Sequence, residues 1–124
     1  MLKLKRVYEP ASPDDGYRVL VERLWPRGVS KERANLDAWS KDLAPSDELR
    51  RWYNHDPEKW DEFRARYRQE LSEPGREEEL ANLADRARLG TVTLVYASKA
   101  SDISNAAALK EFFDSDELVP ARHG

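Results

Sequence analysis

The sequence predicts a small α/β domain in which a three-stranded sheet, parallel or mixed in direction, is covered by about five helices. Three apolar stretches, at 3–8, 17–24 and 91–96, are typical of strands. Between the second and third stretches, apolar side chains recur at helical spacing. A chain of 124 residues can bury one core. We therefore expect a single domain over 1–119 and a flexible tail over 120–124.

The second strand, 17–24, is the element on which the functional prediction depends. Its apolar run Val19-Leu20-Val21 is typical of a buried strand. Pro26 ends the strand, because proline donates no ladder hydrogen bond. The strand should therefore carry Arg23 and Arg27 to one edge of the sheet, where α/β proteins place their ligands.

The other two strands differ in their expected burial. The first, 3–8, alternates apolar and charged side chains, which indicates one exposed face. The eight residues 9–16 connect it to the second strand, and a parallel crossover normally needs about a dozen or more. The first two strands are therefore antiparallel neighbours or are not neighbours at all. The third strand, 91–96, is apolar enough to be buried on both faces.

Capping residues indicate where the helices begin. Ser30 and Asn35 are alternative caps for the first helix. The apolar face of that helix is expected to carry Leu36, Trp39 and Leu43. The other predicted caps are Ser46, Asp56 and Ser104. Gly90 is expected to end the fourth helix in a left-handed conformation.

Composition excludes several classes of protein and of site. The net charge of −3 gives no whole-molecule attraction to nucleic acid, although a local basic patch that binds it is not excluded. No apolar run approaches the ~20 residues of a membrane span, so we expect a cytoplasmic protein with no membrane partner. Without cysteine there is no thiolate nucleophile, and two histidines would need several carboxylates to bind a metal. We predict no metal and no cofactor.

Basic side chains gather around the end of the second strand. Five cations and two acids lie between 18 and 33. Arginine binds phosphate or carboxylate through a planar pair of donors. Residues 97–105 have the order strand, loop and capped helix, which gathers anions at a helix N-terminus. The residues predicted to bind the ligand are Arg18, Arg23, Trp25, Arg27, Ser98, Lys99, Ser101 and Asn105.

Each candidate also has a structural interpretation that the sequence leaves open. His55 and Asp14 are the candidate acid–base groups, but His55 can simply pack on the next helical turn. Arg23 can pair with an internal acid, and Arg27 can be solvated. Residues 98–105 can form an ordinary turn between a strand and a helix.

The hypothesis favoured by these residues is a protein that binds a phosphate- or carboxylate-bearing, nucleotide-like ligand. Hydrolysis of that ligand is not excluded, so whether the protein is an enzyme stays open. The alternative is a non-catalytic module that binds a protein or a nucleic acid through Trp25 and the arginines. A third interpretation gives the arginines a purely structural role. The sequence leaves the oligomeric state open.

The stretch from Gly16 to Gly28, with its string Arg-Leu-Trp-Pro-Arg-Gly, resembles the domain-of-unknown-function family 488 in its short YeaO-like branch. Further matching positions are 43–46, 48–50, 55–57, Trp60, Phe63, Tyr67, 70–71, 93–97 and Asn105. The resemblance implies a compact α/β domain and a bacterial or archaeal, cytosolic origin. It implies no activity, because no reaction is established for the family.

The chain departs from this family at one notable position. Members often carry histidine after the asparagine that matches Asn105, and here Ala106 stands in that place. Any role of that histidine is therefore absent or moved. Longer relatives resemble rhodanese domains faintly. Rhodanese and cysteine-phosphatase chemistry need a thiolate nucleophile, so the resemblance implies an anion cradle without that chemistry.

Overall fold

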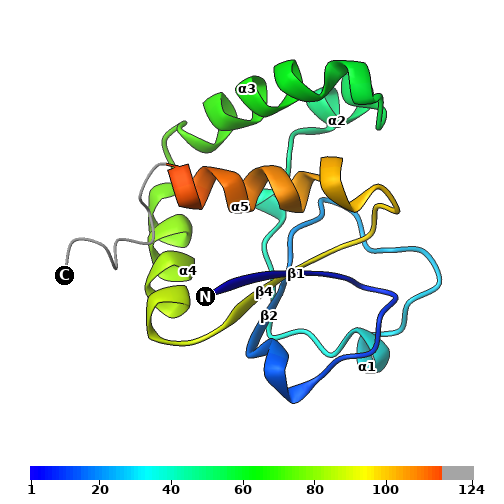
Figure 1. The fold of residues 1–124 in the computed structure, drawn as a ribbon, viewed down its shortest axis with the longest axis vertical. Coiled ribbons are helices and arrows are strands. Elements are labelled where there is room, and N and C mark those ends of the chain that lie inside the picture. The colour runs from blue at the N-terminus through cyan, green and yellow to red at the C-terminus, as the bar shows by residue number, and fades with distance from the viewer. Residues whose placement is uncertain (116–124) are drawn as a thin grey trace.

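The computed structural model describes residues 1–115, and within them four parallel strands form one sheet (Figure 1). The strands are β1 (Leu2–Arg6), β2 (Tyr17–Leu20), β3 (Ala38–Trp39) and β4 (Val92–Tyr96). Their order across the sheet is β1-β4-β2-β3, and every neighbouring pair is parallel. The predicted α/β class with about five helices is confirmed, whereas the predicted number of three strands is wrong. Of the parallel and mixed arrangements that the sequence left open, the parallel one is observed.

The strand missing from the prediction is β3, which lies where the first helix was expected to continue. Ser30 caps helix α1 (Lys31–Ala34), and Asn35 ends it after one turn with a left-handed φ of 47°. The chain then extends, so that β3 pairs with Val19 and Leu20 of β2. The predicted helical face containing Leu36, Trp39 and Leu43 is therefore wrong.

β1 and β2 are not neighbours, because β4 lies between them. The second of the two predicted alternatives is the observed one. Residues 7–16 nevertheless return the chain to a parallel strand, and they do so with the single 3-10 turn η1 (Pro13–Asp15) instead of a full helix. The Thr93 hydroxyl donates to the carbonyl oxygen of Asp15 (2.7 Å), which fixes this crossover to β4.

Gly16 allows this crossover to enter β2. Its φ is +63°, and a Cβ there would lie 2.3 Å from the carbonyl oxygen of Thr91, which accepts the N–H of Tyr17. Gly16→Ala should therefore destabilise the protein by about 2 kcal/mol or more in urea denaturation, through strain and displaced backbone. Gly28→Ala is the matched control, since its φ is +77° with nothing within 4 Å, and it should cost about 1 kcal/mol. Equal losses in the two variants would contradict the close approach at Gly16.

Four longer helices occur in the order expected, three of them between β3 and β4 and one after β4. They are α2 (Asp47–Tyr53), α3 (Trp60–Leu71), α4 (Glu77–Leu89) and α5 (Asn105–Ser115). The hydroxyls of Ser46 and Ser104 accept backbone N–H groups of the first turns of α2 and α5, as predicted. Asp56 caps a 3-10 turn, η3 (Pro57–Lys59), that leads into α3. Gly90 does not end α4 in a left-handed conformation, because its φ is −168°.

The sheet separates two apolar clusters. On one face Val19, Val21 and Leu94 pack against the helices, and α5 contacts both β4 and β1 (Figure 1). On the other face Leu20 and Val95 pack with residues of the connecting segments. All five residues of β4 are buried, as predicted for a strand covered on both faces.

No helix within residues 1–115 combines the length and the apolar character that a membrane span requires. The tail predicted over 120–124 lies outside the described residues.

Candidate functional site

A cavity of about 250 Å³ opens at the carboxyl ends of β2 and β4. Open parallel sheets bind ligands in this position, outside the strand ends. The lining residues come from the two strand ends, from α2 and α3, and from the start of α5. They are Glu22, Arg23, Ala44, Pro45, Arg50, Tyr53, His55, Phe63, Ala97, Ser98 and Asn105.

The floor of the cavity is where β2, β4 and α5 meet. The N–H of Ala97 donates to Oε2 of Glu22 (3.0 Å), which joins the residues after the two strands. Nδ2 of Asn105 donates to the carbonyl oxygen of Val21 (2.6 Å), which ties α5 to the end of β2. Burial raises the pKa of Glu22, while the Ala97 N–H and the charge of Arg50 act in the opposite direction.

Arg23 is held by backbone carbonyl groups and not by an acid. Its Nε donates to the carbonyl oxygen of Pro45 (3.0 Å), and its Nη2 donates to that of Ala44 (3.1 Å). The guanidinium is therefore fixed beside the cavity, while Nη1 makes no hydrogen bond within residues 1–115. The proposed structural pairing of Arg23 with an internal acid is not found among these residues.

Helix α2 and the turn after it bring two further basic side chains, Arg50 and His55, to the cavity. The Glu70 carboxylate of α3 accepts both the N–H and the hydroxyl of Ser46, which anchors the start of α2. One turn later Arg50 lines the cavity, and its contact with Asp47 (3.3 Å) is exposed and therefore weak. After α2 the chain turns with positive φ, 55° at His55, and this brings the exposed imidazole to the cavity.

Two stacked aromatic rings form the apolar wall. The ring centroids of Tyr53 and Phe63 lie 4.0 Å apart with an angle of 17° between the planes. The Tyr53 hydroxyl donates to the carbonyl oxygen of Ile103 (2.7 Å), which links α2 to the segment before α5. Burial, assisted by the charge of Asp56, raises the pKa of Tyr53 to about 12, so its hydroxyl stays neutral at physiological pH.

Comparison with known proteins gives a family but no activity. A family model described as the inactive DUF488-N3 subclade matches residues 1–119. The chain belongs to this DUF488 family. It is 44% identical over 113 residues to the uncharacterised protein Rv3073c of Mycobacterium tuberculosis (strain H37Rv), covering 91% of this chain and 93% of the relative. It is 40% identical over 114 residues to the uncharacterised protein YeaO of Escherichia coli K12, covering 92% and 97%.

The resemblance stated from sequence motifs is thereby confirmed at the level of the DUF488 and YeaO-like family. No solved structure matches the chain at a significant level. None of the comparisons shows a relation to rhodanese domains.

Four of the residues predicted from the sequence line the cavity of this DUF488 protein: Arg23, Ser98, Asn105 and His55. The Ser98 hydroxyl accepts the N–H of Ala100 (3.1 Å). The strand ends therefore bring together the two segments from which a common site was predicted, 17–24 and 97–105.

Two predicted residues lie toward the opposite, amino-terminal end of β2. Arg18 donates from Nη1 to Oδ2 of Asp15 (2.6 Å), and its Nη2 donates to the carbonyl oxygen of Ala34 (2.7 Å). Both members of this ion pair are buried. Asp14 is exposed in η1, just before β2, and does not line the cavity.

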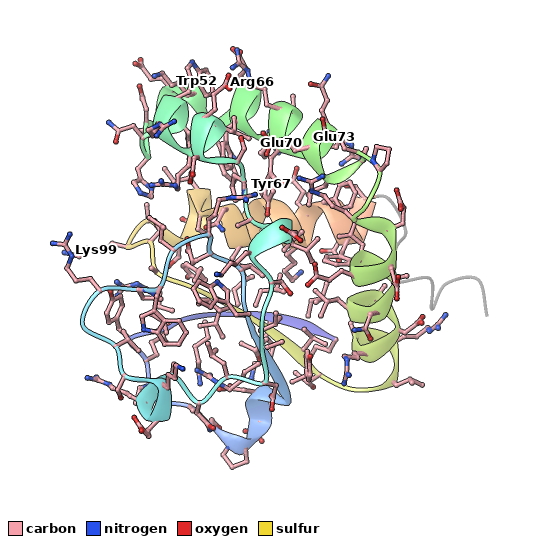
Figure 2. All side chains as sticks on the ribbon, turned by 180° about the vertical axis from the view of Figure 1, so that it is seen from behind. Trp52, Arg66, Tyr67, Glu70, Glu73 and Lys99 are labelled. Atoms are coloured by element: carbon pink, nitrogen blue, oxygen red, sulfur yellow. The ribbon has the colours of Figure 1, made fainter. Side chains whose placement is uncertain are left out.

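The remaining predicted residues do not line the cavity either. The Trp25 indole donates to the carbonyl oxygen of Val29 (2.7 Å) and meets Trp39 edge-on, with centroids 5.3 Å apart. Arg27 is exposed, and Lys99 extends away from the body of the protein (Figure 2). The Ser101 hydroxyl accepts that of Tyr96 (2.7 Å).

Sequence reasoning did not select Glu22 or Arg50. Glu22 directly follows the apolar run Val19-Leu20-Val21, and from this position it could have been predicted to lie at the end of the strand, beside the site. Arg50 carries no such signal, because only the packing of α2 over the strand ends places it at the cavity. Within residues 1–115, no group of three or more histidine or acidic side chains is arranged to hold a metal ion.

Proposed function

We propose that this protein binds a small phosphate- or carboxylate-bearing ligand, of the size of a nucleotide or smaller, in the cavity at the ends of β2 and β4. The observation that supports this is the convergence of three basic side chains, Arg23, Arg50 and His55, on one cavity. The whole chain has a net charge of −3, so this cationic cluster is a local feature. Two arginines against the single carboxylate of Glu22 leave an excess of positive charge at the cavity, and such an excess attracts ligands of the opposite sign.

Arg23 is suited to this role because its guanidinium is already oriented. Two backbone carbonyl groups fix Nε and Nη2, which leaves Nη1 as a donor beside the cavity. A donor fixed before binding loses little conformational entropy when the ligand arrives.

The arrangement of hydroxyl and imidazole groups favours binding over turnover. A nucleophile is normally hydrogen-bonded to a base that a third group orients. The Tyr53 hydroxyl donates to a backbone carbonyl, and within residues 1–115 no hydrogen bond holds the imidazole of His55. The description of the matching subclade as inactive agrees with a non-catalytic role.

Isothermal titration calorimetry with orthophosphate and adenosine 5′-monophosphate tests this function. Arg50→Gln should weaken binding about tenfold or more, because a charge-assisted hydrogen bond contributes about 1.5–3 kcal/mol. Arg51→Gln is the matched control: Arg51 is the next residue of α2, is exposed and does not line the cavity. Binding by the control should equal that of the wild type. Absence of binding, or equal losses in both variants, would contradict the proposal.

A further inference from the structure

We propose that Glu22 recognises a nitrogen donor on the ligand, so that the ligand is an anion that also carries an amino or ammonium group. This inference rests on the proposed function and extends it to the other end of the ligand. It makes Glu22 the residue that determines which anions are accepted.

Glu22 has one oxygen in use and one available. Oε2 accepts the N–H of Ala97, while Oε1 has no hydrogen-bond partner within residues 1–115. Within residues 1–115, Nε of Arg64 is the one side-chain polar atom that is both fully buried and without a hydrogen-bond partner. Oε1 of Glu22 also has no partner, so it must be at least partly exposed to solvent. Glu22 lines the cavity, and the proposed role requires this second oxygen to face it.

No cation of the described chain neutralises this carboxylate through an ion pair. Arg23, its neighbour in sequence, donates instead to the carbonyl groups of Ala44 and Pro45. Arg50 pairs with Asp47 and acts on Glu22 only over a longer distance. A partly buried carboxylate without a cationic partner has lost solvation, and the single N–H of Ala97 replaces only part of it. A donor on a bound ligand would supply the missing interaction.

A second acceptor lies on the same floor of the cavity. Asn105 uses Nδ2 to donate to Val21, which leaves its Oδ1 without a partner among the described residues. Acceptors therefore lie where β2, β4 and α5 meet, and Arg23 and Arg50 bring positive charge to the same cavity. The cavity thus presents hydrogen-bond acceptors as well as cationic donors.

These groups define the ligand class. An anionic group fits the arginines, an N–H donor fits Glu22, and an apolar body fits Tyr53 and Phe63. The cavity volume of about 250 Å³ is below the range of drug-sized pockets, roughly 300–1,000 Å³, so the ligand is small. Amino acids and aminated nucleotides share this chemistry, and the experiment below distinguishes them.

Two pairs of probes differ only in the nitrogen donor. Adenosine 5′-monophosphate is compared with purine riboside 5′-monophosphate, which lacks the amino group, and aspartate is compared with succinate. In calorimetric titrations the wild type should bind the donor-bearing member of one pair about tenfold more tightly or better. The pair that shows this preference identifies the source of the ligand.

Glu22→Gln should abolish that preference while the protein stays folded. The glutamine carbonyl can still accept the Ala97 N–H, which turns its amide N–H₂ toward the cavity and toward the donor of the ligand. Thermal melts followed by circular dichroism check that the fold is retained. Glu78→Gln, at an exposed position of α4, is the control with the same change of charge and should keep the wild-type preference.

The outcomes separate the two proposals. If orthophosphate binds but neither pair shows a preference, the role of Glu22 is overturned and anion binding stands. A preference that survives in Glu22→Gln overturns it equally. If no probe binds, orthophosphate included, the proposed function fails and this inference fails with it.

Discussion

Replacing Asp15 with asparagine is expected to lower the free energy of unfolding by about 3 kcal/mol or more. Asp15 is completely buried, and its two oxygens accept from Lys5, from the N–H of Ser12 and from Arg18. In asparagine one of the two oxygens is replaced by an N–H₂ group, which would face these N–H donors and could not accept from them. The substitution would also leave the charge of Arg18, which is 3% exposed, without its partner.

Urea denaturation of the wild type and Asp15→Asn measures this loss. Asp14→Asn is the matched control, since the side chain of Asp14 is exposed and forms no ion pair among the described residues. It should change stability by less than about 0.5 kcal/mol. Similar losses in both variants would contradict the importance of the buried pair.

The same group gives the protein a defined response to acid. Burial alone would raise the pKa of Asp15, but Lys5, the N–H of Ser12 and Arg18 together lower it from 3.8 to about 2. A carboxyl whose pKa is lower in the folded state stabilises the fold above the unfolded value of 3.8. That contribution, about 2 kcal/mol, should be lost as the pH falls from about 4 to about 2. In Asp15→Asn this part of the pH dependence should be missing.

Phe63→Ala is expected to cost about 3–5 kcal/mol of stability. The ring is 1% exposed, stacks on Tyr53 at 4.0 Å and also meets Tyr67, with centroids 5.6 Å apart. Its removal leaves a void between α2 and α3 and withdraws support from the apolar wall of the cavity.

Thermal and urea denaturation measure the effect of Phe63→Ala. Leu89→Ala provides a comparison at an apolar residue that is 87% exposed, at the end of α4. That variant should change stability by no more than about 0.5 kcal/mol. A loss below about 1 kcal/mol in Phe63→Ala would show that the aromatic stack contributes little.

Local signals in the sequence predicted most of the elements around the sheet. Ser46 and Ser104 cap helices as expected, because a hydroxyl that accepts a first-turn N–H acts within a few residues. The apolar stretch that became β4 is buried on both faces. In each case the physical cause lies within the segment itself.

The strand β3 could not be predicted in this way. It has two residues, Ala38 and Trp39, which are too few to show any periodicity. What makes it a strand is its pairing with β2, an interaction between segments about 20 residues apart. The spacing of Leu36 and Trp39 suits a helix equally well, so tertiary pairing decided between the two.

The site shows the same division between local and tertiary causes. Arg23, Ser98 and Asn105 follow strand ends or begin a helix, and their places at the cavity were predictable from that order. Arg50 reaches the cavity only because α2 folds over the strand ends. Glu22 was not selected because, in the sequence, it entered only as one of the two acids that offset the five cations between 18 and 33. Its place at the cavity depends on where β2 ends, at Leu20, and on its hydrogen bond from Ala97 after β4.

For Arg18 the sequence contained the correct signal, a nearby acid, but Arg18 was interpreted as a ligand-binding residue. It was predicted to bind the ligand, and an acid three residues away, Asp15, holds it in a buried pair instead. Within residues 1–115, Lys99 and Arg27 form no such ion pair, and both are exposed. The sequence places all of these cations near the same edge of the sheet. Only the tertiary structure shows which of them line the cavity and which are exposed to solvent.

The location of ligand binding is tested most directly by amide chemical shifts in a two-dimensional ¹H–¹⁵N titration with adenosine 5′-monophosphate. Progressive, saturable shifts are expected for the amides of Arg23, Ala97, Ser98 and Asn105, and Arg50→Gln should reduce all of them. Saturable shifts elsewhere with these amides unmoved, or no shifts at all, would contradict the claim that the cavity at the ends of β2 and β4 is the ligand site.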